Sequence, residues 1–146
     1  MKSNHKKAAF TLVDLVVVVL ILGLLAGVAA PKFLNTSKTA TESGLKQTLT
    51  ILRDAIELYT AENGGTLPPC VNSGTSLQTA LAPYIRGQFP LNPIAPNNDD
   101  VEATTTSPVV ATASAIHGWK YNTNTGEIIC NSDSLSSDGT TTYDAY

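Results

Sequence analysis

The pattern of apolar and polar residues divides the chain into three stretches. Residues 10–30 form an almost unbroken apolar run, in which Thr11 and Asp14 are the only polar residues. A helix rises about 1.5 Å per residue, so a helix over this run would cover roughly the 30 Å hydrocarbon core of a bilayer. The pattern therefore predicts a membrane-spanning helix.

Residues 31–63 indicate an amphipathic continuation of that helix. Gly64 and Gly65 follow it, and glycine is common just past the C-terminus of a helix. We expect one helix from Phe10 to about Asn63, apolar all round in its first half and one-sided in its second. A coiled coil over the second half is the alternative, although about three heptads are few for one. Apolar residues recur there at steps of four and three, which places them on one stripe of the helix: Leu45, Leu49, Leu52, Ile56 and Tyr59.

Gly23, Gly27 and Pro31 interrupt the helical signal. An interior proline costs a helix about 3 kcal/mol relative to alanine, and a glycine costs up to about 1 kcal/mol. Pro31 also lacks the N–H that would bond to the carbonyl of Gly27. We expect a kink here, or a segment that unwinds inside a packed assembly. Close helix packing on the two glycines is the alternative.

Residues 64–146 form the third stretch and are rich in loops. We expect a short helix over residues 76–85 with Ser76 as its N-cap. The prolines at 90 and 93 predict a rigid connector over 89–94, because a residue before proline avoids the helical region. Residues 97–115 indicate an exposed loop around a short strand at 109–112.

The clearest hairpin in the chain has strands at 118–121 and 127–130, around turn residues at 122–126. Trp119, Tyr121 and Ile129 are expected in the core rather than in a ligand site. The elements together predict an α+β fold, in which a small antiparallel β-region packs on the second half of the long helix.

Cys70 and Cys130 both follow the apolar run. Beyond a membrane they would lie in an oxidising compartment, where a disulfide between them is favoured. Closing this loop would stabilise the fold by roughly 3–4.5 kcal/mol on the chain-entropy model. A zinc site is not expected, because the chain has no CxxC motif and its two histidines, His5 and His117, are isolated.

Composition and charge argue against some classes of function. The 146 residues are a single-domain length, with a net charge of -3. Loss of residues 1–9, which hold three of the nine basic residues, would leave 6 basic and 12 acidic residues, a charge of -6. An acidic chain without a basic patch is not expected to bind nucleic acid. The chain carries no nucleophile elbow and no glycine-rich phosphate loop, so we do not expect an enzyme.

The N-terminal motif carries a family resemblance. Residues 6–14, KKAAFTLVD, resemble the cleavage and methylation motif of type IV pilins and of the pseudopilins of type II secretion. Gly23 and Pro31 agree with that family as well. Two positions depart from it: Ala9 stands where the family usually has Gly, and Asp14 stands where it usually has Glu. The resemblance covers about the first fifth of the chain and implies a pilin-like fold.

This resemblance implies a sequence of processing steps. A prepilin peptidase would cut between Ala9 and Phe10 and methylate the new N-terminus at Phe10, so that residues 1–9 are a leader peptide. The amine of Phe10 would then form a salt bridge with Asp14 of a neighbouring subunit. A lone carboxylate in the apolar run costs about 2.5–3.5 kcal/mol, so pairing of subunits in register would neutralise two costly charges.

Two later segments are also similar to major pseudopilins. Residues 89–94, FPLNPI, are similar to the Leu-Pro-x-Asp-Pro-Trp segment of those proteins. Residues 134–139, SLSSDG, are similar to their calcium-binding loop. Calcium takes six to eight oxygen ligands. The resemblance makes Leu135, Ser137, Asp138 and Asp144 candidate calcium ligands, with a solvated tail without calcium as the alternative.

The sequence thus predicts four regions: the leader at 1–9, a membrane and filament-core helix at 10–30, its amphipathic continuation at 31–63, and a head at 64–146. The lysines before the apolar run predict a cytoplasmic N-terminus in the inner membrane. We expect a structural subunit that self-assembles into a helical filament with the help of prepilin peptidase and an inner-membrane assembly platform. A type II secretion pseudopilus is favoured. A type IV pilus and a non-polymerising, membrane-anchored binding domain are the alternatives.

A cleaved secretory signal is the rival interpretation of the N-terminus. Val28, Ala29 and Ala30 could form its small-residue cut site. Pro31 would then be the first mature residue, which is unfavourable, and the apolar run is longer than a signal core of about 7–15 residues.

Overall fold

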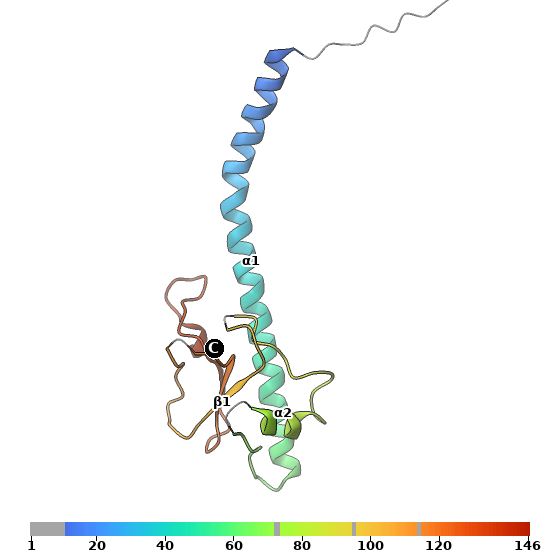
Figure 1. The fold of residues 1–146 in the computed structure, drawn as a ribbon, viewed down its shortest axis with the longest axis vertical. Helices are drawn as coiled ribbons and strands as arrows, with labels where there is room; N and C mark the ends of the chain where they lie inside the picture. The colour runs from blue at the N-terminus through green and yellow to red at the C-terminus, as the bar shows by residue number, and fades with distance from the viewer. Residues whose placement is uncertain (1–10, 72–73, 95, 114) are drawn as a thin grey trace, which may run out of the picture. The chain divides into compact units, whose positions relative to one another are not determined.

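The computed structural model describes residues 11–71, 74–94, 96–113 and 115–146, with only the backbone described at 31 and 33–35. Its elements are a long helix, a short helix, three strands and a 3-10 helix (Figure 1): α1 (Leu12–Glu62), α2 (Thr75–Leu81), β1 (Val101–Thr104), β2 (Trp119–Asn122), β3 (Ile128–Cys130) and η1 (Tyr143–Ala145). This is the predicted α+β, pilin-like fold.

The chain divides into two compact units. The first reaches to Ser37 and the second is Lys38–Tyr146, so the C-terminal part of α1 belongs to the second unit. In the structure the amphipathic second half of α1 and the residues after 63 share one core, in agreement with the predicted packing of the β-region on that half of the helix.

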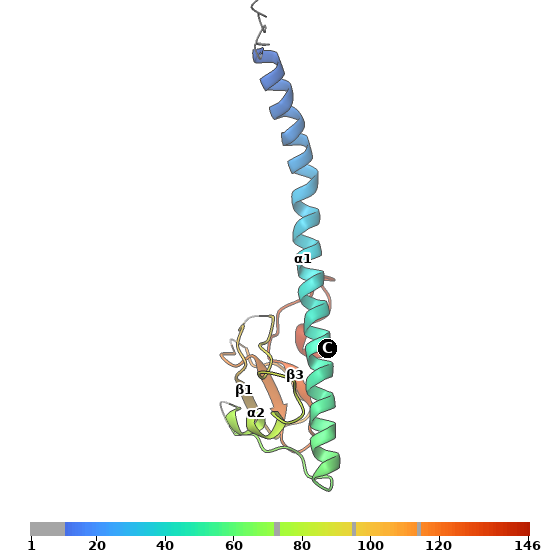
Figure 2. The ribbon, with the colours of Figure 1, turned by 90° about the vertical axis from the view of Figure 1, so that its right-hand side faces the viewer.

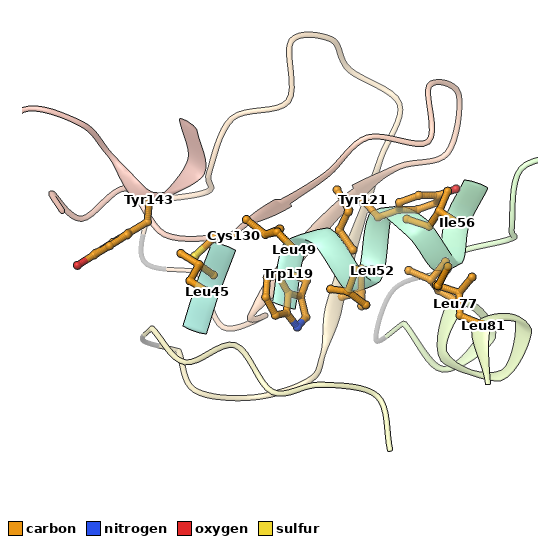
Figure 3. Close-up of a cluster of buried hydrophobic side chains, with 13 residues drawn as sticks. Leu45, Leu49, Leu52, Ile56, Leu77, Leu81, Trp119, Tyr121, Cys130 and Tyr143 are labelled. Atoms are coloured by element: carbon orange, nitrogen blue, oxygen red, sulfur yellow. The ribbon is translucent and has the colours of Figure 1, made fainter. Parts of the chain in front are cut away.

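The stripe predicted on the second half of the long helix forms one wall of that core. Leu45, Leu49 and Leu52 are each at most 1% exposed. Figure 3 shows these side chains beside Trp119 and Tyr121 of the sheet, with leucines from α2 at one end. Because these positions share one helical face, a single helix supplies a continuous apolar surface to the sheet.

The sheet is mixed, which corrects the predicted antiparallel β-region. Its order is β1-β2-β3, with β1 parallel to β2 and β2 antiparallel to β3. The strand expected at 109–112 does not form, and β1 lies earlier, at Val101–Thr104. Val101 is fully buried in the core, and residues 105–118 are long enough for the crossover that a parallel pair needs.

The predicted hairpin is present, and its side chains alternate between two faces. Trp119 pairs with Cys130 and Tyr121 pairs with Ile128, and all four side chains belong to the core cluster. Ile129 is buried but lies outside that cluster, because it is the partner of Lys120 on the other face. Ile129 is thus buried, as predicted, but it packs on the face of the sheet opposite the core cluster of Trp119 and Tyr121.

The helix boundaries depend on glycine. Past α1, Gly64 and Gly65 have φ of 64° and 88°, and the Gly65 N–H donates to the Thr60 carbonyl at 2.8 Å. Gly74 precedes α2 as its N-cap with φ of 71°. The predicted cap Ser76 instead accepts a bond from the Val71 N–H at 3.0 Å, because it lies inside the helix.

Candidate functional site

The apolar part of α1 is fully exposed. The window Leu12–Ala30 has a mean hydropathy of 2.9 and none of it is buried. Among the described helices, α1 is the one long and apolar enough to cross a membrane. Core helices of soluble proteins can be equally apolar, but they are mostly buried. An unburied apolar helix needs an apolar environment outside its own chain.

Asp14 caps the start of this helix. The Thr11 N–H donates to Asp14 Oδ2 at 3.0 Å, and the Asp14 N–H donates to Thr11 Oγ1 at 3.2 Å. The Thr11 hydroxyl also donates to Asp14 Oδ2, at 2.7 Å. These reciprocal bonds form a capping box, in which Thr11 is the N-cap and Asp14 is the third helical residue. The signal Thr-x-x-Asp is visible in the sequence and was missed there.

Only some of the residues in the other N-terminal predictions lie in the part of the chain that the structure describes. Ala9, Phe10 and the whole leader lie outside the described residues, so the cleavage site, the methylation and the Phe10–Asp14 salt bridge stay predictions. Gly23, Gly27 and Pro31 all lie within α1, whose helical backbone continues through them. The predicted kink also stays a prediction.

Cys70 and Cys130 are free thiols in the structure, which does not form the predicted disulfide. Cys130 is paired with Trp119 at the start of β2. Cys70 shares a cavity of about 380 Å³ with Thr104 and Thr123, at the opposite end of that strand. Three residues of strand span roughly 10 Å, whereas disulfides join Cα atoms about 4.4–6.8 Å apart.

Cys130 is buried and Cys70 is partly buried. Burial raises the pKa of Cys70 to about 11. It raises the pKa of Cys130 to about 11 too, although the Asn92 amide, which donates to Cys130 Sγ at 3.2 Å, partly opposes this effect. Both cysteines are therefore protonated at neutral pH, a state in which thiols are poor nucleophiles.

The candidate calcium ligands are engaged with protein donors. Asp138 closes a turn by accepting bonds from the Thr140 N–H at 2.7 Å and from the Thr141 N–H at 2.9 Å. These bonds lower the pKa of Asp138 well below its usual range. Asp144 accepts a bond from the Ala111 N–H at 3.0 Å, and Ser137 bonds to Glu42. The Leu135 side chain is exposed, and its backbone forms an isolated bridge with Thr142.

Among the described residues, no group of three or more histidine, cysteine, aspartate or glutamate side chains could hold a metal ion. The calcium site stays a prediction, and calcium would have to displace the N–H donors around Asp138.

A half-buried polar network on the outer face of the sheet was missed in the sequence. Glu102 of β1 and Lys120 of β2 are register partners, with Nζ 3.3 Å from Oε1. The Thr112 hydroxyl and the Asn131 amide donate to Glu102 Oε2, each at 2.9 Å. The Asn131 side-chain oxygen accepts from the Thr112 N–H at 2.8 Å. The network fixes the crossover loop to the sheet, and it explains why residues 109–112 need no strand partner.

Comparison with known proteins finds relatives that match a little under half of the chain. The chain matches no family model, and no solved structure matches it. It is 33% identical over 63 residues, 43% of its length, to the type II secretion system core protein G of Vibrio cholerae. It is 31% identical over 61 residues, 42% of its length, to the major component of the type IV narrow pilus of Thermus thermophilus. The matches span 43% and 52% of those relatives, so the chain covers about half of each.

Proposed function

Since these matches confirm the resemblance to type IV pilins and pseudopilins, we propose that the chain is a structural subunit of a type IV-like filament. The observation that carries this proposal is the unburied apolar helix at Leu12–Ala30, with its mean hydropathy of 2.9. A folded unit with its own core follows it in the chain. The role is mechanical and requires no catalytic group.

The apolar helix has two environments that suit it. In the membrane, lipid covers its side chains before assembly. In a filament, the helices of neighbouring copies would cover them instead. Transfer from lipid to protein gains little hydrophobic energy, so close packing and polar contacts must favour the filament. A neutralised Asp14 supplies such a contact, because an unpaired carboxylate costs about 2.5–3.5 kcal/mol in lipid.

The processing steps form part of the same proposal. Prepilin peptidase would cut between Ala9 and Phe10 on the cytoplasmic side, where Lys2, Lys6 and Lys7 hold the N-terminus. The new amine of Phe10 lies four residues from Asp14, about one helical turn. An inner-membrane platform would then add each subunit to the filament, with the second unit outside the cytoplasm.

A pseudopilus of type II secretion is the more specific proposal. The two relatives are nearly equally similar and favour neither system. The resemblance of residues 89–94 and 134–139 to major pseudopilins favours the pseudopilus. A type IV pilus is the second candidate, supported by the pilus relative.

The first test is the intact mass and N-terminal sequence of the protein purified from its native membrane. A chain that begins at methylated Phe10 supports prepilin processing. A chain that begins at Pro31 would show a cleaved secretory signal and would contradict the filament proposal. An uncut Met1 chain would indicate a plain anchor, or a peptidase blocked by Ala9. Deletion of the gene then separates the two filaments, because only a pseudopilus is needed for secretion.

A further inference from the structure

The last residues of the described chain fold back onto α1. The segment 134–146, here called the C-terminal strap, contains the Asp138 turn and η1. It is ordered by its own bonds, since the Ser136 N–H donates to the Thr141 carbonyl at 2.8 Å and the Tyr143 N–H donates to the Ser134 carbonyl at 3.1 Å. Both ribbon views place the C-terminal end beside α1 (Figure 1 and Figure 2).

One buried carboxylate on α1 holds the centre of the strap. Glu42 is 7% exposed, and Ser137 donates to it twice, from its backbone N–H and, at 2.7 Å, from its hydroxyl. The Tyr143 hydroxyl donates to Glu42 Oε1 at 3.2 Å. Three donors therefore converge on one side chain from residues 95 and 101 positions further along the chain.

The end of the strap is held more weakly. Arg53 donates to the Tyr146 carbonyl at 2.9 Å, and the Lys46 ammonium lies 4.2 Å from the centre of the Tyr146 ring. Both side chains come from the exposed side of α1, where such contacts contribute about 1 kcal/mol or less. Asp144 adds its bond from the Ala111 N–H. Among the α1 side chains that contact the strap through Ser137, Tyr143 and Tyr146, Glu42 is thus the buried one.

The bonds to Glu42 favour its ionised form. The pKa of Glu42 is lowered, first by the bond from the Ser137 hydroxyl; burial opposes this, and the Ser137 amide and the Tyr143 hydroxyl add to the lowering. The charged or titratable groups that face it are Lys46 on α1 and Tyr143 on η1. Bonds to a charged acceptor are roughly twice as strong as neutral ones.

We propose that the ionised Glu42 side chain locks the C-terminal strap onto α1, and that loss of this charge opens the strap while the core beneath it stays folded. The lock is closed at neutral pH. It weakens as the pH falls through the titration range of Glu42, because the native state must then take up a proton that its three donors disfavour. In the opened state the core cluster of α1 and the sheet loses Tyr143, which belongs to the strap, and retains its leucines and Trp119.

The test is hydrogen–deuterium exchange on the full chain in detergent micelles, comparing wild type with Glu42→Gln at pH 7 and at pH 3.5. For each peptide we divide the exchange rate of the variant by that of wild type. The ratio for peptides over 134–146 is called the strap ratio, and peptides over 45–56 report on the core. Taking the ratio at each pH removes the intrinsic pH dependence of exchange. We expect the strap ratio to be roughly five to ten at pH 7 and clearly smaller at pH 3.5, because Glu42 of wild type then takes up a proton when the strap opens and its charge contributes less to the lock. The ratio for 45–56 should stay near one throughout.

Glu57→Gln is the matched control, since it makes the same change at an exposed position of α1, and its strap ratio should be one at both pH values. A strap ratio of one for Glu42→Gln at pH 7 would overturn the proposal. An equally raised ratio at both pH values would overturn it too, because the charge would then not matter.

If Glu42→Gln fails to fold, Ser137→Ala replaces it. That variant removes one of the three donors, so its strap ratio should be several-fold at pH 7 and closer to one at pH 3.5. A ratio of one at pH 7 would contradict the lock.

Discussion

At the scale of single residues, Asp14 has a role inside its own chain that is separate from the proposed contact with a neighbour. Its carboxylate accepts bonds from the amide and the hydroxyl of Thr11 and so caps α1. A capping box usually has Glu or Gln at this position, and here the shorter Asp reaches the amide at 3.0 Å. The capping bonds also reduce the cost of the carboxylate in lipid, because a bonded acid is less costly there than a bare one.

The two roles of Asp14 can be separated by substitution. Thr11→Ala removes the cap, at about 1 kcal/mol of helix stability, but keeps the carboxylate. Asp14→Asn removes the charge while remaining easy to insert into lipid. We expect Asp14→Asn to reduce filament yield at least about tenfold, since the charge pair with the Phe10 amine is lost, and Thr11→Ala to have a much smaller effect. Filament sheared from cells and quantified by immunoblot measures this. Equal yields for Asp14→Asn and wild type would refute the assembly salt bridge.

Glu102 is another carboxylate whose ionised form is favoured by the fold. Burial raises its pKa, but bonds from Asn131 and Thr112 and the charge of Lys120 outweigh this, and the pKa is lowered overall. A lowered carboxyl pKa contributes stability above its ordinary value, and this contribution is lost as the pH falls through the folded-state value.

Glu102→Gln should therefore destabilise the second unit at pH 7 by about 1–3 kcal/mol, because Lys120, with a side chain 13% exposed, loses its charged partner. As the pH falls from about 4 through the lowered folded-state pKa of Glu102, the difference from wild type should shrink, because the wild-type carboxylate takes up a proton as well. Thermal unfolding at several pH values measures both effects. Glu127→Gln, at an exposed position beside the same hairpin, is the control and should leave the midpoint unchanged.

At the scale of elements, the turn between β2 and β3 fixes how the hairpin meets the end of α1. Gly126 has φ of 78°, and a Cβ there would lie 2.7 Å from Leu67 Cδ2. Its N–H donates to the Asn122 carbonyl at 2.9 Å. Gly139 in the strap also has a positive φ, of 69°, but has open space around it. The two glycines thus share backbone strain but differ in packing.

Gly126→Ala should cost more stability than Gly139→Ala. Both substitutions put alanine in the left-handed region, at about 1 kcal/mol or somewhat more each. Gly126→Ala must in addition displace the Leu67 side chain, so we expect a further cost of about 1 kcal/mol. Chemical denaturation of the two variants measures the difference. Equal costs would show that Leu67 moves aside freely.

The elements also show what sequence could and could not predict. The stripe from Leu45 to Tyr59 was predictable because helical periodicity is local, and the hairpin was predictable because turn residues separate two apolar runs. Strand β1 could not be predicted in this way, because Val101 is the one fully buried residue in it. Its parallel partner, β2, also lies beyond a long crossover in the chain. Glu42 was missed for a related reason, since an acid on a helix indicates solvent unless its distant partners are known.

Some features of the candidate site could likewise be predicted from the sequence, and others could not. The apolar helix follows from composition alone, and the Thr-x-x-Asp cap was readable from four residues. The Glu102 network was not readable, because Thr112 and Asn131 reach it from separate loops. The structure does not form the Cys70–Cys130 disulfide, which was expected from an oxidising compartment alone, whereas the fold decides which thiols come together.

At the scale of the whole molecule, the second unit is held together by its core and its polar networks without a covalent link. Both thiols are free in the structure. We expect unfolded protein from its native membrane to react with two equivalents of a thiol reagent, and reductant to leave the thermal midpoint unchanged. A protein with no reactive thiol and a midpoint lowered by reductant would show that the folded state rearranges to form the disulfide.

The separation along the chain between the two sides of the core also sets the order of events during synthesis. The Glu42 carboxylate and the Tyr143 hydroxyl are 101 positions apart. At about 5–20 residues per second, the ribosome adds that length in on the order of ten seconds. The apolar helix is therefore made well before the sheet, and until the sheet follows, the side chains at Leu45–Ile56 have no partner to cover them. Such a surface is prone to aggregation, so the interval between synthesis of α1 and closure of the core is when a chaperone would protect this protein.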